Sequence, residues 1–527
     1  MIALSTENIV NIVHIVRGVE PREPQDLVLP VRRNMERMRR EGLPGTFLIV
    51  YDAMEDPTLL AALRQGAEEF EIGGWFEIVE PMTREAGLPW RGRWAWDYHA
   101  DVGMSIGYTP EQRRILVDVY MRRFHAAFGY YPHSMGAWIL DCVTLDYLYE
   151  KYGIQAAAIC RDQCGTDGYT LWGGYYSQGY YPSRNNTLCP AQTADRQIPV
   201  PVFRMLGSDP IHQYDAGLSA DGEPADWQPV ITLEPVCREG GGSPQWVDWY
   251  FAENFRGDAL GFAYAQTGQE NSFGWPAMEK GLDWQYTRLR ELKSRGKLRV
   301  ETLGETGAWM RRSFPLTPAV SQVFRTDWSS RGAGTVWYAS RYYRINLLWE
   351  SGRLLLRDLH LFDQEYPERY RETPVLTHSA IYDTLPVVDG YRFCSRGTRA
   401  GGRFTLGGQP AVCLGVEATP LPPDTLRVDV RLEGGGILRI LCSETHIEMG
   451  VDGCAGSAGP LCLTMTGTAA HLSAQACGQS LTLTYNGFAY VLRLEAGHYD
   501  TADGEITAVA DGGRLIIPTA DCGVAQE

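Results

Sequence analysis

Apolar runs alternate with amphipathic segments through the first 310 residues of the chain. The apolar runs are short and predict buried strands, whereas the segments between them repeat apolar positions at helical spacing. Strand-like runs cover residues 8–16, 45–52, 70–79, 133–140, 154–160, 199–207, 229–235 and 261–268. Helical patterns cover 27–42, 57–66, 111–129 and 142–153. Because strand and helix alternate seven or eight times, the pattern predicts an α/β fold with a (β/α)7–8 barrel.

The pattern changes after Pro315, where short alternating segments are separated by Gly, Asn and Asp turns. Such a texture is typical of an antiparallel β-sandwich. We therefore predict a barrel at 1–315, a mixed or β connecting region packed on it at 316–390, and a β-sandwich domain at 391–527. Arg344 lies early enough in this second half to pack against the barrel.

The overall charge excludes several classes of function. A net charge of −16 at pH 7 disfavours binding to nucleic acids and to anionic membrane surfaces.

The chain has no apolar run of about 18 residues and no basic segment ahead of an apolar one, which predicts a cytoplasmic protein without a membrane span. The 12 cysteines form no CxxC pair and no zinc-like spacing, so we expect no cofactor. The 15 tryptophans and 28 tyrosines would suit stacking on sugars, as well as ordinary core packing.

Carboxylates follow nearly every predicted strand, at the end of a barrel where active sites form. Several carboxylates converging on one mouth are what sugar hydrolysis needs, since one protonates the leaving oxygen and another acts as base or nucleophile. The candidates for these catalytic roles are Asp141, Asp162, Asp167 and Glu270. The candidates for substrate binding are His14, Arg17, Glu20, Trp75, Glu77, His99, Asp101, Trp138, Arg184, Arg204 and Gln269.

Some of these residues also have a structural interpretation. Asp141 is suitably placed to cap the helix 142–153, because Asp is a favoured N-cap residue. His99 and Asp101 form an HxD pair that suits a metal, a sugar or a structural hydrogen bond. Arg184 and Arg204 suit a substrate carboxylate or sulfate, or the neutralisation of nearby acids.

Three segments carry a family resemblance. GTFLIVYD, FEIGGWFEI and FGYYPHSMGAWILDCVTLDYLYEKYGI occur in the order found in polysaccharide deacetylase (NodB-homology) barrels, which residues 8–310 therefore resemble. The layout is also similar to glycoside hydrolase families 57 and 38. The resemblance to family 57 implies that Asp141, at the end of GAWILD, is the nucleophile. The deacetylase metal residues are not matched, because Arg17 to Glu20 replace an Asp-Asp pair and Trp75 and Glu77 replace histidines.

These observations favour a glycoside hydrolase that acts on oligosaccharides or glycoconjugates, with Asp141 as nucleophile or base and Glu270, Asp162 or Asp167 as acid. Two alternatives stay open. One is a metal-dependent carbohydrate deacetylase or amidohydrolase with a remodelled site, in which His14, His99 and Asp101 would hold a divalent ion. The other is a non-catalytic carbohydrate-binding protein. Homo-oligomerisation is also left open.

Overall fold

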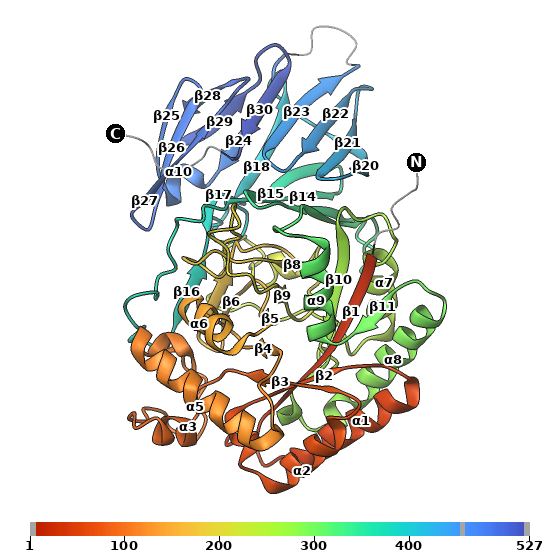
Figure 1. Cartoon of the computed structure of the whole chain (residues 1–527). Helices are drawn as coiled ribbons and strands as arrows, with labels where there is room; N and C mark the ends of the chain where they lie inside the picture. The colour runs from red at the N-terminus through yellow and green to blue at the C-terminus, as the bar shows by residue number, and fades with distance from the viewer. Residues whose placement is uncertain (1–6, 454–458, 521–527) are drawn as a thin grey trace.

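The N-terminal half forms a nearly closed, barrel-like sheet, shown in Figure 1. The computed structural model describes residues 7–453 and 459–520. The strand order is β10-β1-β2-β3-β4-β5-β9-β8, with β11 also paired to β1. The pairs are parallel except for β8 with β9, so the predicted parallel α/β organisation is confirmed. The strand bounds are β1 (Glu7–Val16), β2 (Thr46–Ile49), β3 (Glu71–Trp75), β4 (Ser134–Gly136), β5 (Ala156–Ile159), β8 (Gly179–Tyr180), β9 (Val202–Arg204), β10 (Phe262–Thr267) and β11 (Arg299–Glu301).

Helices cover the outside of this sheet (Figure 1). Local sequence signals define their ends: Thr109 and Gln112 form a capping box at the start of α5, and Gly129 ends it in the left-handed conformation with φ of 81°. The bounds of the helices are α1 (Val28–Glu41), α2 (Pro57–Gly66), α3 (Glu80–Glu85), α4 (Ala100–Gly103), α5 (Pro110–Phe128), α6 (Cys142–Tyr152), α7 (Pro244–Asn254), α8 (Trp275–Ser294) and α9 (Leu303–Ser313).

The strand predicted at 229–235 is wrong. This segment is a loop between β9 and α7, and its backbone groups bond to other loops. The Leu233 N–H donates to the Leu206 carbonyl at 2.9 Å, and the Gly241 N–H donates to the Thr232 carbonyl at 2.7 Å. Prolines at both ends of the segment remove two backbone donors that a central strand would need.

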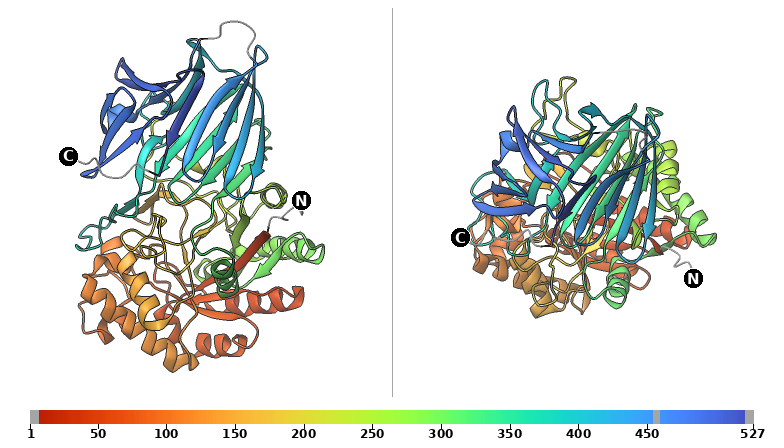
Figure 2. Two further views of the ribbon diagram at one scale, coloured as in Figure 1. Left: turned by 45° about the horizontal axis from the view of Figure 1, so that its top comes forward. Right: turned by 90° about the horizontal axis from the view of Figure 1, so that it is seen from above.

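Within the described residues, the C-terminal half is all-β apart from the single-turn helix α10 (Thr468–His471), in line with the sequence prediction. A ten-stranded sheet and a five-stranded sheet share one apolar core, and a three-stranded sheet packs beside them (Figure 2). The ten-stranded sheet contains β12 (Val320–Phe324), β13 (Gly334–Ala339), β14 (Tyr343–Glu350), β15 (Arg353–Leu361), β17 (Leu385–Asp389), β18 (Gly401–Leu406), β19 (Gln409–Pro410), β24 (Leu461–Thr466), β28 (His498–Ala502) and β29 (Glu505–Val509). The five-stranded sheet contains β20 (Cys413–Leu421), β21 (Thr425–Leu432), β22 (Ile437–Cys442), β23 (His446–Asp452) and β30 (Arg514–Pro518), and the three-stranded sheet β25 (Ser473–Cys477), β26 (Ser480–Tyr485) and β27 (Phe488–Arg493).

The two halves are joined by a small shared sheet. The hairpin formed by β6 (Gln163–Thr166) and β7 (Tyr169–Trp172) follows the barrel strand β5, and β16 (Ala380–Asp383) from the C-terminal half pairs with β7 in parallel. The C-terminal half therefore holds in place a hairpin that rises from the barrel. No helix in the described part of the chain is long and apolar enough to cross a membrane.

Candidate active site

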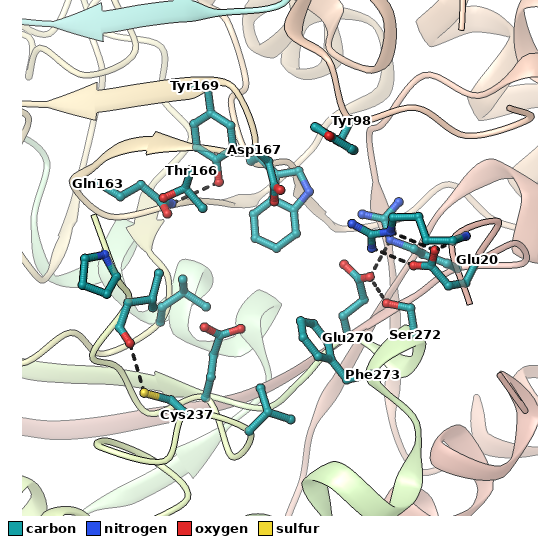
Figure 3. Close-up of a pocket in the computed structure, with 18 of the residues that line it drawn as sticks. Glu20, Tyr98, Gln163, Thr166, Asp167, Tyr169, Cys237, Glu270, Ser272 and Phe273 are labelled. Carbon is teal, nitrogen blue, oxygen red and sulfur yellow. Dashed lines mark hydrogen bonds and ion pairs between the residues drawn. The ribbon is translucent and has the colours of Figure 1, made fainter. Parts of the chain in front are cut away.

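A cavity of about 890 Å³ lies where the barrel strands end. Its walls come from the segments after β1, β4 and β10, from the insertion between β3 and α5, from the β6–β7 hairpin and from the loop 229–239. Figure 3 shows Asp167 and Glu270 pointing into it from different walls. The position agrees with the rule that barrel active sites lie at the carboxyl ends of the strands.

Arg17, directly after β1, is the electrostatic centre of one wall. Its side chain is 1% exposed and pairs through Nη1 with Glu77 at 2.6 Å and through Nε with Glu270 at 2.7 Å. Its guanidinium also lies 4.2 Å from the centre of the Trp96 ring, a cation–π distance. Trp96 and Trp75 donate their indole N–H groups to Glu77, at 2.9 Å and 3.2 Å. These contacts fix Arg17 and thereby fix Glu270, which reaches the cavity.

Glu234 and Glu270 are two carboxylates with different surroundings in the same cavity. Glu270 is held by the charge of Arg17 and accepts a hydrogen bond from Ser272. Glu234 has neutral partners: Gln269 Nε2 donates to it at 3.1 Å and Thr232 Oγ1 at 3.2 Å. Burial raises the pKa of Glu234, and repulsion from Glu270 adds to the rise. One carboxylate is therefore biased towards holding a proton, while its neighbour is paired with a cation, as acid–base catalysis requires.

Asp167 enters the cavity from the tip of the β6–β7 hairpin. It and Gly168 have φ of 47° and 78°, the conformation of a type I′ turn, for which Asp-Gly is a preferred sequence. In the described part of the chain its carboxylate has no hydrogen-bond or ion-pair partner. The residue as a whole is exposed, but partial burial of its carboxyl group raises the pKa; the charge of Arg22 opposes the rise and that of Glu270 adds to it.

Aromatic side chains form much of the remaining wall. Trp138, Trp96, Tyr98 and Tyr169 line the cavity, and Trp75 packs edge-on against Trp138 with ring centres 4.9 Å apart. Flat apolar rings beside carboxylates are a suitable environment for a sugar, whose ring faces are apolar and whose edges carry hydroxyls.

The structure brings together some of the residues selected from sequence. Those that line the cavity are Arg17, Glu20, Trp138, Asp167 and Glu270. Trp75 and Glu77 lie behind that wall, and Gln269 lines a small recess that adjoins it. The predicted residues that do not line the cavity are His14, His99, Asp101, Asp141, Asp162, Arg184 and Arg204.

Asp141 does not fit the role of nucleophile. It is fully buried and caps α6, accepting hydrogen bonds from the Thr144 N–H at 3.0 Å and from Ser105. Arg113 pairs with it at 3.0 Å, and both side chains are 0% exposed. Asp141 is therefore the N-cap of α6, as one interpretation of the sequence predicted. Its side chain points into the protein core and not towards the cavity.

We expect Asp141→Asn to reduce stability and leave catalysis unchanged. Asn keeps a capping oxygen, but the buried charge of Arg113 loses its partner, which costs about 3–5 kcal/mol. Thermal unfolding and steady-state kinetics on the same preparation would test this. A collapse of kcat with an unchanged melting temperature would contradict the structural role.

Asp162, Arg204 and Arg184 also have structural partners. Asp162 pairs with Arg204 at 2.8 Å and with Arg344, which lies on β14 of the C-terminal half. Arg184 pairs with Asp146 near the surface of α6. The proposed binding of a substrate anion by Arg184 or Arg204 is thus replaced by the neutralisation of nearby acids.

The residues suggested for a divalent ion do not form one ligand set among the described residues, although His99 and Asp101 both contact His378. His14 is buried, bonds to Tyr286 and the Gln269 carbonyl, and its pKa is lowered to about 4 by burial. His99 pairs with Asp97 at 2.9 Å, and Asp101 pairs with His378. Across residues 7–453 and 459–520, no three His, Cys, Asp or Glu side chains are placed to hold a metal ion. The donor set therefore does not fit the metal site of the deacetylases that the chain resembles.

Several cavity residues were not selected from sequence, namely Arg22, Trp96, Tyr98, Gln163, Tyr169 and Glu234. Two features of the sequence point to some of these residues. TDGY contains the Asp-Gly pair of a tight hairpin, which places its neighbours on strands. Glu234 ends a strand-like segment and is followed by proline, but only the folded loop shows that it faces Glu270 and Asp167.

Comparisons with known proteins support the fold. No family model matches the chain, and no curated protein matches it. A solved structure from Parabacteroides distasonis, provisionally described as a glycoside hydrolase/deacetylase, is similar with a TM-score of 0.55 and 16% identity over 73% of this chain and 92% of that one. A provisionally described polysaccharide deacetylase from Pseudomonas aeruginosa has a TM-score of 0.36 and 13% identity over 59% and 93% of the two chains.

The first of these structures supports the deacetylase-type barrel predicted from the sequence, and at 16% identity it shows the fold alone. The finer resemblance to glycoside hydrolase families 57 and 38 is not supported.

Proposed function

We propose that this chain is a carbohydrate-active hydrolase in which Glu234 and Glu270 transfer protons. The observation that carries the proposal is the unequal pair of carboxylates in one aromatic cavity. Glu234 is biased towards its protonated form and supplies the proton to the leaving group. Glu270, held beside Arg17, acts as the base or nucleophile.

Two bonds are compatible with such a site. The paired carboxylates fit cleavage of a glycosidic bond, for which two acidic groups suffice. The deacetylase-type barrel favours cleavage of an acyl bond, in which Glu270 would activate water and Glu234 would protonate the departing group. The fold comparison favours the deacetylase alternative and does not support the glycosidase that the sequence favoured, so acyl cleavage is the first expectation, and the products distinguish the two reactions.

The test is a hydrolysis screen of the purified protein. The substrates are aryl α- and β-glycosides of neutral, N-acetylated and amino sugars together with O- and N-acetylated sugars, and the assay measures released aglycone and released acetate in the same reaction. Aglycone release identifies a glycosidase, and acetate release identifies a deacetylase. Turnover that is unchanged in Glu234→Gln and in Glu270→Gln would refute the assigned roles.

We expect EDTA to leave the activity unchanged. The reason is the donor set, since no group of three potential ligands is assembled among the described residues. Overnight dialysis against EDTA, followed by assay with and without added Zn²⁺ or Co²⁺, measures this. Activity that disappears on dialysis and returns with one of the ions would show a metal-dependent reaction.

A further inference from the structure

The cavity has an excess of negative charge. Six carboxylates and three arginines line it. Arg17 is already paired twice, with Glu77 and Glu270, and Arg22 pairs with Glu20 at 2.7 Å. Arg17 and Arg22 are therefore neutralised by their own partners and have little attraction left for an anionic ligand, while Arg238 is an exposed residue.

Four of the lining carboxylates have no ion-pair partner among the described residues, namely Glu23, Asp167, Glu234 and Glu239. Asp167 and Glu234 are the two of these on which the charge of Glu270 acts. Asp167 has no hydrogen-bond or ion-pair partner within the described residues, and Glu234 receives hydrogen bonds from uncharged donors. The charge of Glu270 contributes to the raised pKa of both, and Asp167 also contributes to that of Glu234, whereas the charge of Arg22 opposes the rise at Asp167. A cation in the space between these carboxylates would relieve their repulsion.

A second observation concerns Gln269. Its side chain is 5% exposed, its Nε2 donates to Glu234, and its Oε1 is buried without a hydrogen-bond partner. The residue lines a recess of about 20 Å³ that Glu234 and Glu270 also line, room for one small polar group. A buried acceptor without a donor is costly, so this oxygen gains from a donor that a water molecule or a ligand in the recess supplies.

We propose, building on the function proposed above, that the substrate is a carbohydrate with protonated amino groups, bound through Asp167 and the free oxygen of Gln269. The carboxylate oxygens of Asp167 and Glu234 and the buried, unpaired oxygen of Gln269 are acceptors, whereas an ammonium group is a donor with three N–H bonds. The rings of Trp138 and Tyr98 favour a cation on their faces as well as a sugar ring. A uronic acid or a sulfated sugar meets uncompensated carboxylates and is rejected.

The test measures binding, so that it does not depend on turnover. Oligomers of glucosamine and of galactosamine are compared with N-acetylated and with neutral oligomers of the same length and linkage, by isothermal titration calorimetry. We expect the amino oligomers to bind about tenfold more tightly than the neutral ones at low salt. This advantage should shrink as salt is raised, since exposed charges are screened.

Two variants test which side chains produce the preference for amino oligomers. Asp167→Asn and Gln269→Leu should each reduce the preference for the amino oligomer about tenfold, with little effect on the neutral one. Glu239→Gln, which removes the same charge from the exposed rim of the cavity, is the matched control and should reduce the preference less than Asp167→Asn.

Equal binding of amino and neutral oligomers, tighter binding of an acidic oligomer, or no binding of any amino oligomer would overturn this inference. Hydrolysis of a neutral substrate with equal binding would leave the hydrolase assignment intact and remove only the charge preference. Preferential binding of amino oligomers without hydrolysis of any substrate would leave the charge preference intact and remove the hydrolase assignment.

Discussion

Glu234→Gln is expected to lower kcat/KM by about 10²–10⁴-fold, the range for loss of a general acid or base. The amide has the shape of the carboxyl group; its oxygen can still accept from Gln269 Nε2, and its NH2 group can donate to Thr232 Oγ1, so the cavity should keep its form. What is lost is the proton that Glu234 supplies. The measurement is steady-state kinetics on the substrate found in the screen, with a thermal melt of each variant.

The pH profile provides a second readout. Because the pKa of Glu234 is raised, the group stays protonated above the ordinary range of a glutamic acid and loses its proton as pH rises further. Activity should therefore fall on the alkaline side in the wild type, and this alkaline limb should be absent in Glu234→Gln. If Glu234→Gln kept both the wild-type rate and the fall in activity at alkaline pH, another group would supply the proton.

Glu270→Gln should produce a loss of activity of similar size. The amide lacks the negative charge that Arg17 stabilises, so it can act neither as a base nor as a nucleophile. Asp141→Asn is the matched control, since it alters a buried carboxylate that also pairs with an arginine but lies outside the cavity. If the control and the Glu270 variant lost activity equally, the cavity would have no special role.

The barrel could be predicted because its signals are local. The alternation of strands and helices can be predicted without any knowledge of long-range contacts. It follows from apolar runs of strand length, from helix caps and from the order of the three family-like segments. The one misassigned strand, 229–235, has the right apolar pattern, but its partners are loops far away in sequence. Pattern alone carries no information about such partners.

The site could be predicted only in part, because its residues owe their positions to tertiary contacts. Glu270 and Arg17 follow strands directly, so the barrel rule places them at the mouth. Asp141 also follows a strand, yet Arg113 from α5 draws its side chain into the core. Asp167 reaches the cavity through a hairpin held by β16, which lies more than 200 residues later in the chain.

Arg344→Met is expected to destabilise the protein by about 3–5 kcal/mol, the range for breaking a buried ion pair from one side. The guanidinium makes two bonds to Asp358, at 2.9 and 2.8 Å, and also contacts Asp162. Asp162 keeps Arg204, but Asp358, fully buried, loses its cation. Chemical denaturation of wild type and variant measures the loss, and Arg396→Met, at an exposed ion pair, should show no measurable change.

The double variant Arg344→Met/Asp358→Leu tests whether the loss of stability comes from an unpaired buried charge in the ionic cluster of Arg344, Asp358 and Asp162. Replacing both partners removes the unpaired buried charge, so a large share of the lost stability should return. Because Arg344 on β14 reaches Asp162 beside the barrel, the single variant should also separate the unfolding of the two halves into distinct transitions. A single cooperative transition with a loss below about 1 kcal/mol would mean that the apolar contacts between the halves, and not this ionic cluster, hold the C-terminal sheet on the barrel.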